Sequence, residues 1–420
     1  MSLKGRGAKA AALVVVGLTL VWTGCGDLYR PVANPLPCTL SCGDPERVAH
    51  ALVLSTNGSA SQGTAVIIDV SGDTMVGSLT GDYVGRNPVN AVANGGFDYV
   101  ANLADDNVVD FTVPAAGIPL TTNKISLNAG AMPVFLAVGG GKVFVAESGL
   151  ATVEDIGNSQ SIPVGNTPVA LVATPDGTQL YAVNQGDNPP TVSVIFPSTD
   201  QNVATLKLPA GAKPVWGAVS ADGTRVAILN QGTNSVTVID TVADAVIPPG
   251  AGSPCTQDTF CVGAGPNYIY YEGTSNRFYV TSPADNSLTI INNGVDAYQC
   301  AATPSMCVQT ISMAGPPCNG QHPVSVTALA DGSRAYVADD VTNSVCVMQT
   351  SNNAFSKSIP VGTAPVFIAS DPNSIRVYTA NSGSGNVSLI ETVDDMPVAG
   401  SNGPLTISTG GTPTFIAITP

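Results

Sequence analysis

The sequence contains few charged residues, few aromatic residues and almost no histidine. Only 11% of its 420 residues are charged, whereas 44% are hydrophobic, so the chain can form a large core and is not expected to be disordered. The two histidines, His50 and His322, are far apart in sequence and do not form a histidine cluster. Neither a G-x-S-x-G nucleophile motif nor a C-x-x-C-H haem-attachment motif occurs. These absences leave little support for an enzyme.

Long segments with helical periodicity are also missing. A helical protein of this length would contain stretches rich in Ala, Glu, Lys and Leu with a period of 3.6 residues. Instead, Val, Ile, Thr and Tyr alternate with small polar residues, and 44 Gly and 32 Pro interrupt the chain throughout. The sequence therefore predicts an all-β fold.

One short phrase recurs along the chain: a Pro, an alternating apolar run, a D-G turn, and a second apolar run ending in Asn or Asp. Clear copies begin at Pro168, Pro214 and Pro323, the first reading P-V-A-L-V-A-T-P-D-G-T-Q-L-Y-A-V-N. A repeat of small all-strand units is typical of a β-propeller. The opening prolines are Pro88, Pro133, Pro168, Pro214, Pro266, Pro323, Pro365 and Pro413.

Seven of these prolines open complete four-strand units, and Pro413 opens a single strand at the C-terminus. Three strand candidates remain near the N-terminus, at Ala51 to Ser55, Thr64 to Val70 and Thr74 to Leu79. Joining the C-terminal strand to these three completes an eighth blade from both termini and leaves no open edge. We therefore predict eight four-stranded blades, with seven as the alternative if the N-terminal strands form an irregular cap.

The strings L-Y-A-V-N, A-Y-V-A-D and V-Y-T-A-N, followed by N-S-V-T-V-I-D or N-V-S-L-I-E, resemble the YVTN family of β-propeller repeats. The resemblance covers residues 48–420. That family includes surface-layer proteins, lipoproteins and uncharacterised exported proteins, and it is more distantly similar to the propellers of lactonases and of quinoprotein or haem-d1 enzymes. The resemblance implies a fold and leaves the activity open.

The first 24 residues are predicted to be a lipoprotein signal peptide. Three basic residues precede an apolar run, Ala10 to Trp22, that is too short to span a bilayer. The small residue before Cys25 resembles a lipobox, in which Cys25 becomes the lipid-bearing N-terminus. Gly26 follows in place of the Asp that retains lipoproteins in the inner membrane, which favours the outer membrane, facing the periplasm or the exterior. The alternative is an ordinary signal peptide that is cleaved elsewhere.

Residues 25–46 would then be a leader that contains Pro and Cys, and residues 47–420 the propeller. The signal segment carries three positive charges and no negative charge, so the net charge of −15 becomes −18 in the mature chain. Such a surface repels phosphate backbones and anionic lipids, which argues against nucleic acid as a partner. We expect contact with the membrane through the lipid anchor alone.

Apart from Cys25, the chain has eight cysteines, an even number that predicts disulfides in an exported protein. Closeness in sequence favours the pairs Cys38–Cys42, Cys255–Cys261 and Cys300–Cys307, which leaves Cys318 with Cys346. The rival interpretation is a zinc site, because C-x3-C resembles half of one, but no second close Cys pair has zinc spacing.

Several polar residues are expected on one face of the propeller. Because strands alternate in direction, the loops before the opening prolines and the loops after each second strand share a face, which we call the proline face. Asp105, Asp106, Asp339 and Asp340 lie in these loops and could bind Ca²⁺, although Asp and Asn also cap turns. No other cofactor is expected. The strand-end residues Asn102, Asn184, Asn230, Asn381 and Asp339 could bind a sugar or peptide, but their repetition favours a turn that every blade requires.

Two residues after the opening proline, five of the eight blades have an aromatic residue. The first strand of a propeller blade is the innermost, so these rings should lie near the axis, either as core packing or as the lining of a ligand site. His322 is the single residue best suited to act as an acid, a base or a ligand. The aromatic residues are Phe135, Trp216, Tyr268, Phe367 and Phe415.

The sequence thus favours a non-catalytic binding or scaffold protein, anchored by lipid at the cell envelope, that holds a protein, peptide or glycan on its loop-rich face. The first alternative is an enzyme that distantly resembles lactonases or quinoprotein dehydrogenases, which would need converging charged groups or a cofactor in the axial channel. A third interpretation is a structural envelope protein whose ring spaces other components.

Overall fold

The computed structural model describes residues 50–70, 72–80, 84–112, 122–248, 259–293, 307–371, 373, 375–401 and 403–419. The chain divides into the units Met1–Pro31 and Val32–Pro420, and the fold below belongs to the second. The predicted signal peptide, Cys25 and the pair Cys38–Cys42 lie outside the described residues. None of the described helices is both long and apolar enough to span a membrane.

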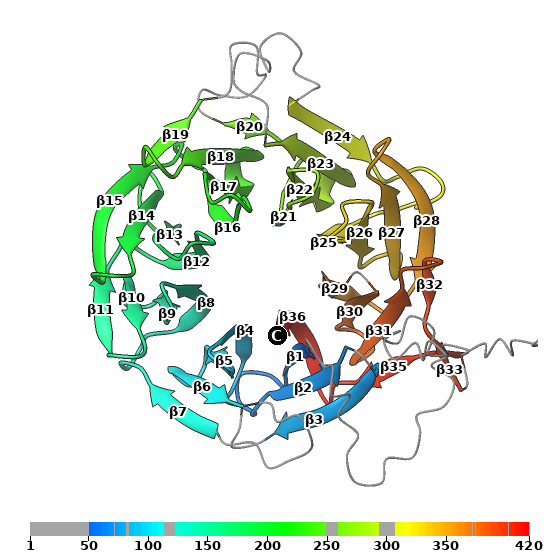
Figure 1. Cartoon of the computed structure of the whole chain (residues 1–420), viewed down its shortest axis with the longest axis horizontal. Coiled ribbons are helices and arrows are strands. Elements are labelled where there is room, and N and C mark those ends of the chain that lie inside the picture. The colour runs from blue at the N-terminus through cyan, green and yellow to red at the C-terminus, as the bar shows by residue number, and fades with distance from the viewer. Residues whose placement is uncertain are drawn as a thin grey trace, which may run out of the picture. The chain divides into compact units, whose positions relative to one another are not determined.

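Eight antiparallel four-stranded sheets surround a common axis, which confirms the predicted eight-bladed propeller (Figure 1). We number the blades by their innermost strands along the chain. Blade 1 has β4 (Pro88–Asn94), β5 (Phe97–Asn102), β6 (Asn107–Phe111) and β7 (Thr122–Ser126); blade 2 has β8 (Pro133–Gly139), β9 (Lys142–Glu147), β10 (Thr152–Asp155) and β11 (Gln160–Pro163); blade 3 has β12 (Pro168–Ala173), β13 (Leu180–Asn184), β14 (Thr191–Phe196) and β15 (Gln201–Lys207).

In two of the remaining blades the fourth position is shared by two short strands. Blade 4 has β16 (Pro214–Val219), β17 (Arg225–Asn230), β18 (Ser235–Asp240), β19 (Ala245–Ile247) and β20 (Phe260–Cys261); blade 5 has β21 (Tyr268–Glu272), β22 (Arg277–Ser282), β23 (Ser287–Asn292) and β24 (Val308–Ser312); blade 6 has β25 (Pro323–Ala328), β26 (Arg334–Asp339), β27 (Ser344–Gln349) and β28 (Ala354–Pro360); blade 7 has β29 (Pro365–Ser370), β30 (Arg376–Asn381), β31 (Asn386–Glu391), β32 (Met396–Pro397) and β35 (Thr406–Ser408). The hairpin β33 (Ala399–Gly400) and β34 (Gly403–Pro404) and the 3-10 turns Gln231–Thr233 and Pro283–Asp285 complete the elements.

Blade 8 is built from both ends of the chain, as the leftover strands predict. The C-terminal strand β36 (Thr412–Thr419) is innermost and pairs with β1 (His50–Thr56), which is followed outward by β2 (Thr64–Asp69) and β3 (Thr74–Thr80). The pairing runs from His50 opposite Thr419 to Thr56 opposite Thr412. This closure covers the strand edges that an open ring would expose.

The repeated residues have local structural roles. In the turn after β12, Asp176 accepts hydrogen bonds from the backbone N–H and the hydroxyl of Thr178, and Gly177 adopts a positive φ of 69°. A Cβ atom at Gly177 would also lie 2.4 Å from the backbone nitrogen of Gly140 in blade 2, so this turn requires glycine for space as well. The apolar residues of the strands then pack between neighbouring blades, forming separate clusters around the ring.

A contact between neighbouring blades recurs on the face opposite the proline face. The turn between the third and fourth strands contains an Asp or Asn with positive φ, and the second strand of the preceding blade binds its side chain. We call each such contact an interblade latch. The latches are Lys142 Nζ to Asp200 (2.8 Å), Tyr181 Oη to Asp244 (3.0 Å), Arg277 Nη1 to Asn353 (3.0 Å), Arg334 Nη1 to Asp395 (2.6 Å) and Arg376 Nε to Asp73 (2.8 Å).

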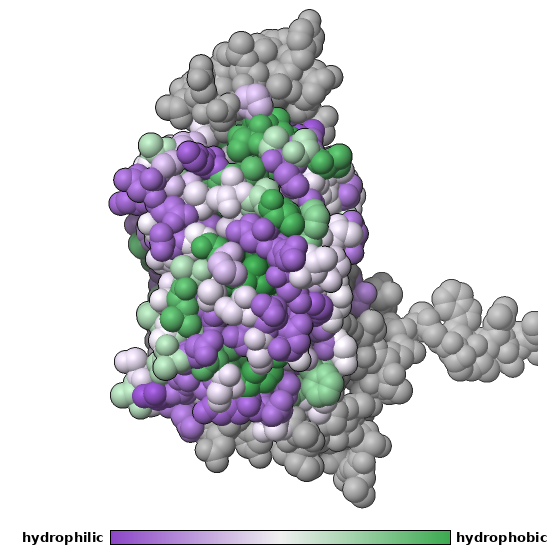
Figure 2. All heavy atoms as spheres, turned by 90° about the vertical axis from the view of Figure 1, so that its left-hand side faces the viewer, coloured by the Kyte–Doolittle hydropathy of each residue, from purple (hydrophilic) through white to green (hydrophobic). Residues whose placement is uncertain are grey.

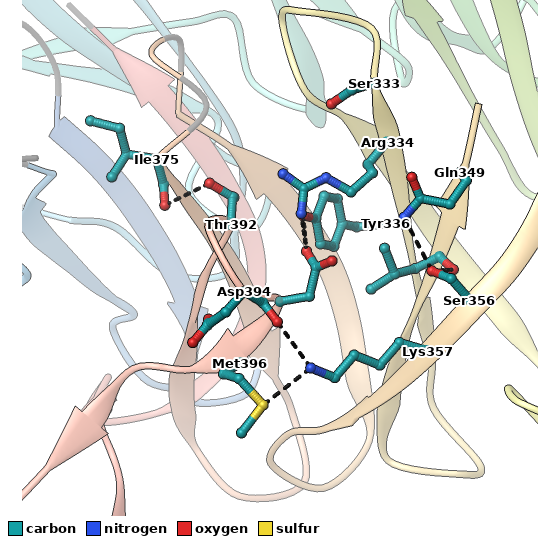
Figure 3. A network of polar contacts seen from close by, with 12 residues as sticks. Ser333, Arg334, Tyr336, Gln349, Ser356, Lys357, Ile375, Thr392, Asp394 and Met396 are labelled. Atoms are coloured by element: carbon teal, nitrogen blue, oxygen red, sulfur yellow. Dashed lines mark hydrogen bonds and ion pairs between the residues drawn. The ribbon is translucent and has the colours of Figure 1, made fainter. Parts of the chain in front are cut away.

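Figure 3 shows the latch between blades 6 and 7. Arg334 and Tyr336 approach the turn that carries Asp394, and the Asp395 carboxylate accepts a hydrogen bond from each. On the same turn Lys357 Nζ donates to the backbone carbonyl of Asp394, 3.0 Å away. The latch therefore joins a charged and an aromatic side chain of one blade to a single carboxylate of the next.

Figure 2 shows one side of the outer wall. Figure 2 views the left-hand side of Figure 1, where the outer strands of blades 2 and 3 lie, and hydrophilic residues there are mixed with scattered apolar ones. Exposed and partly buried residues alternate in the second half of β15, as expected for an edge strand with one solvated face. Scattered exposed apolar residues such as Val203 are ordinary on a protein surface.

The latch predicts an asymmetry between two adjacent carboxylates. Asp395→Ala should lower the free energy of unfolding by about 2 kcal/mol, because Arg334 and Tyr336 lose their common acceptor. Asp394→Ala is the matched control, because the exposed side chain of Asp394 makes no hydrogen bond or ion pair among the described residues, and it should change stability by less than about 0.5 kcal/mol. Urea unfolding of both variants measures the difference, and equal stabilities would contradict the role of the latch.

Candidate functional site

The five predicted aromatic residues form one continuous arc at the axis. Each lies on the innermost strand of a different blade, and each ring contacts the next along the series. The centroid distances are 5.0 Å for Phe135–Trp216, 5.2 Å for Trp216–Tyr268, 5.4 Å for Tyr268–Phe367 and 4.7 Å for Phe367–Phe415, within the range of favourable aromatic pairs. The arc thus runs through blades 2, 4, 5, 7 and 8.

The arc combines the two roles that the sequence left open. Each ring packs against an apolar cluster between blades, so all five contribute to the core. Each of the five residues is nevertheless only partly buried, so part of its surface remains accessible. Core packing and a surface available for stacking are therefore both present in the same side chains.

Three blades contribute a small or polar residue instead of a ring. Ala170 and Ser325 are buried and lie on blades 3 and 6, between blades whose rings touch each other. Asn90, on blade 1, separates the two ends of the arc, and its Oδ1 accepts the backbone N–H of Leu136 at 2.8 Å. The small side chains leave the space in which rings from non-adjacent blades meet.

Two hydroxyl groups associated with the arc lack hydrogen-bond partners among the described residues. The Ser325 hydroxyl is buried without a partner. No described residue pairs with the Tyr268 hydroxyl, and burial, assisted by the neighbouring Tyr270, raises the pKa of the Tyr268 phenol. Tyr268 therefore stays protonated at neutral pH and can donate a hydrogen bond. A mostly apolar surface with a few polar groups is the usual composition of a ligand site.

The acidic residues of the proline face are largely occupied by backbone donors. The loops that lead to the opening prolines direct their N–H groups at these carboxylates: Arg86 N to Asp105 (2.6 Å), Gly130 N and Met132 N to Asp106 (both 2.8 Å), and Gln321 N and His322 N to Asp339 (2.7 and 2.8 Å). Although burial acts in the opposite direction, the N–H group and guanidinium of Arg86 hold the pKa of Asp105 below its usual range. These contacts match the turn-capping interpretation.

The four aspartates suggested for Ca²⁺ do not converge. Asp105 and Asp106 cap loops of blades 1 and 2, whereas Asp339 and Asp340 belong to blade 6. Within the described ranges, no group of three or more His, Cys, Asp or Glu side chains could hold a metal ion. In the described part of the chain, the four aspartates therefore do not form one Ca²⁺ site.

The strand-end amides are also structural. Asn102, Asn184, Asn230, Asn381 and Asp339 are all fully buried. Asn184 Nδ2 donates to Ser193 Oγ at 3.0 Å, and Asn230 Nδ2 donates to Thr237 Oγ1 at 2.8 Å, so these amides join the second strand to the third. Their burial keeps them from contacting a ligand, in agreement with the turn interpretation.

His322 is oriented by a carboxylate at the proline face. Its Nδ1 lies 2.8 Å from Oδ1 of Asp340, and the His322 side chain is 44% exposed. No described residue pairs with its other ring nitrogen, Nε2. A histidine held by a carboxylate, with its second nitrogen accessible, can act as a proton acceptor or as a hydrogen-bonding group.

Cys318 and Cys346 form the disulfide predicted by elimination, with their Cα atoms 5.5 Å apart. The bond joins the loop before β25 to β27 and is buried in the cluster between blades 5 and 6. Cys261 and Cys307 are also disulfide-bonded, and their predicted partners, Cys255 and Cys300, lie outside the described residues.

A buried pair of glutamates in blade 2 replaces the Asn–Ser or Asn–Thr pairs of blades 3, 4 and 7, which sequence reasoning missed. Glu147 occupies the strand-end position of Asn184, and Glu154 occupies the position of Ser193. Both side chains are buried, and Glu147 Oε1 has no hydrogen-bond donor. Burial raises the pKa of both carboxyls, and the Glu147 charge raises that of Glu154 further. Comparing the repeats position by position would have revealed the substitution.

The glutamate pair predicts that stability falls as pH rises. A carboxyl whose pKa is raised in the folded state stabilises the fold fully below the unfolded value, near 4.5, and this contribution is lost as pH rises through the folded value. Glu147→Gln should therefore raise the free energy of unfolding at pH 7 by about 1–3 kcal/mol, the usual cost of an unsatisfied buried polar group, with a smaller gain at pH 4. Chemical denaturation at both pH values tests this, and a Glu147→Gln variant that is less stable at pH 7 would refute it.

Comparisons with known proteins support the fold and leave the function open. No family model matches the chain, and no curated protein is similar to it. Among solved structures, AztD from Citrobacter koseri is 12% identical with a TM-score of 0.60, covering 88% of this chain and 97% of that one. The periplasmic gluconolactonase of Pseudomonas aeruginosa is 14% identical with a TM-score of 0.57, covering 89% and 99%.

Virginiamycin B lyase from Staphylococcus aureus is 15% identical with a TM-score of 0.51, covering 70% of this chain and 92% of that one. All three identities are below 25%. The likeness therefore shows the fold alone, and the YVTN resemblance stays a prediction from the sequence.

Proposed function

We propose that the chain is a binding protein that takes its ligand at the axis, on the aromatic arc, from the proline face. The observation that carries this proposal is the series of four ring contacts at 4.7–5.4 Å between partly buried side chains of five blades. Partly exposed aromatic faces stack flat groups, such as another ring or the apolar face of a sugar. The predicted partner is a protein, peptide or glycan. In this proposal, the part of the partner that contacts the arc is a flat group, such as an aromatic side chain or a sugar ring.

The proposed setting is the cell envelope. The apolar run before Cys25 supports export and lipid attachment, and the disulfide Cys318–Cys346 is consistent with an oxidising compartment. In that setting the propeller is tethered by its N-terminal lipid, facing the periplasm or the exterior. The intact mass of the mature chain should therefore correspond to a chain that begins at Cys25 and carries acyl groups.

A second candidate function is hydrolysis of a lactone. The His322–Asp340 pair supports it, because a histidine oriented by a carboxylate can accept a proton from an attacking water. The fold is shared with a protein described as a periplasmic gluconolactonase. Turnover of gluconolactone that is lost in His322→Gln would favour this candidate over binding alone.

Binding at the arc can be tested with a flat neutral probe, N-phenyl-1-naphthylamine. The chain has only two tryptophans, and Trp22 lies in the predicted signal segment, so energy transfer from Trp216 to the probe reports on the axis. Transfer should disappear in Trp216→Phe. Phe367→Leu, which keeps an apolar side chain but removes the ring, should weaken binding about tenfold.

Phe97→Ala is the matched control, because Phe97 is exposed and lies at the turn between β4 and β5, on the opposite face. It should leave the affinity for the probe unchanged. A folded Phe367→Leu variant that binds the probe as tightly as the unmodified protein would reject the axial site.

A further inference from the structure

The innermost loops of the proline face carry positive charge and no negative charge. These loops are the two residues that precede each opening proline, and among these positions in all eight blades the charged or titratable residues are Arg86, Lys213 and His322. The chain as a whole has 30 acidic residues and 15 basic ones, so acids would be expected to predominate here as they do elsewhere. At these sixteen positions basic residues thus outnumber acidic ones, the reverse of the chain as a whole.

The acids of the same face lie in other loops, and most of them are occupied by donors of the innermost loops. Asp105, Asp106 and Asp339 direct their oxygens at backbone N–H groups of the innermost loops, and Asp187 and Asp285 do the same with Asn166 N and Ala264 N, both at 2.9 Å. Each carboxylate is therefore partly compensated by the peptide dipoles that it accepts. The aspartates thus fix the position of the innermost loops, and the basic side chains belong to those loops.

The three cationic or titratable side chains differ in how far they are already paired. Arg86 is bound to Asp105, with Nε 2.6 Å from Oδ1. His322 is bound to Asp340 through Nδ1 and keeps Nε2 unpaired among the described residues. Lys213 is exposed, and no described residue pairs with its amino group. Lys213 is accordingly the cation most available to a ligand.

The register places Lys213 and His322 next to the arc. Lys213 precedes Trp216 by three residues, and His322 precedes Ser325 by three residues, in the gap where Tyr268 meets Phe367. Three residues of strand span about 10 Å, and a lysine side chain bridges much of that distance. A single small molecule can therefore touch an aromatic ring and a cation at the same time.

We infer that the axial site takes a flat organic anion: a planar ring that carries a carboxylate, sulfonate or phosphate group. The ring stacks on the arc, Tyr268 donates a hydrogen bond, and the anionic group faces Lys213 and His322 at the proline face. This inference rests on the proposed binding function and adds the chemical class of the ligand. The net charge of −15 repels anions from the rest of the surface, so any preference for an anion must arise locally.

The test compares two probes with one aromatic frame: 1-anilinonaphthalene-8-sulfonate, which is anionic, and N-phenyl-1-naphthylamine, which lacks the sulfonate. Energy transfer from Trp216 measures the affinity of each probe for the mature chain, which lacks Trp22. The sulfonate probe should bind more tightly at low salt, and the difference should shrink as salt is raised. Lys213→Gln should weaken binding of the sulfonate probe about fivefold and leave binding of the neutral probe unchanged.

Lys207→Gln is the matched control, because Lys207 is an exposed lysine at the end of the outermost strand β15. It should change neither affinity. Equal binding of the two probes to the unmodified protein, or a Lys213→Gln variant that binds the sulfonate probe unchanged, would overturn the inference while the binding function stands. If neither probe receives energy from Trp216, the binding function itself fails.

Discussion

The pairing of the last strand with the first described strand is the constraint on which the molecule depends. Strand β36 lies innermost in blade 8 and connects residues that are as far apart in the chain as His50 and Thr419. The same strand carries Phe415, so the pairing that closes the propeller also brings Phe415 into contact with Phe367 and completes the aromatic arc. The buried latch from Arg376 to Asp73 then joins blade 7 to blade 8 beside the closure. Without β36 the sheet of blade 8 would end in an exposed edge.

The repeat separates structural residues from candidate functional ones. Features that recur in register, such as the strand-end amides and the aspartates that accept loop N–H groups, hold each blade together. Features that break the repeat lie where function is proposed: rings in five blades, a lone lysine at the entrance, and one histidine bound to Asp340. Glu147 and Glu154 also break the repeat, and they predict a pH-dependent stability rather than a binding role.

Much of this architecture could be predicted from the sequence, because local signals set it. The opening prolines and D-G turns mark each blade. The strands predicted near the N-terminus, Ala51 to Ser55, Thr64 to Val70 and Thr74 to Leu79, match β1, β2 and β3 to within one residue at each end. Three strands left over at one end and one at the other predicted the shared blade. The pair Cys318–Cys346 followed from elimination.

The contacts between blades could not be predicted in this way. Tyr336 and Asp395 are 59 residues apart, and the sequence around either residue does not predict their contact. The aspartates of the proline face were equally ambiguous, because their partners are backbone N–H groups of another loop, which a sequence does not display. The contacts among the aromatic rings depend on the small residues Ala170 and Ser325 in the blades between them. These contacts form only when the blades are arranged around the axis of the closed propeller.

Removing residues 412–420 tests the central claim most directly, because it deletes β36 while leaving every other blade intact. Phe415→Ala is the companion variant, since it removes the ring of the arc but keeps the strand. If closure governs the fold, the truncated protein should aggregate or lose its cooperative thermal transition, whereas Phe415→Ala should still unfold cooperatively at a lower temperature. A truncated protein that stays monomeric, with an unchanged transition, would contradict the account.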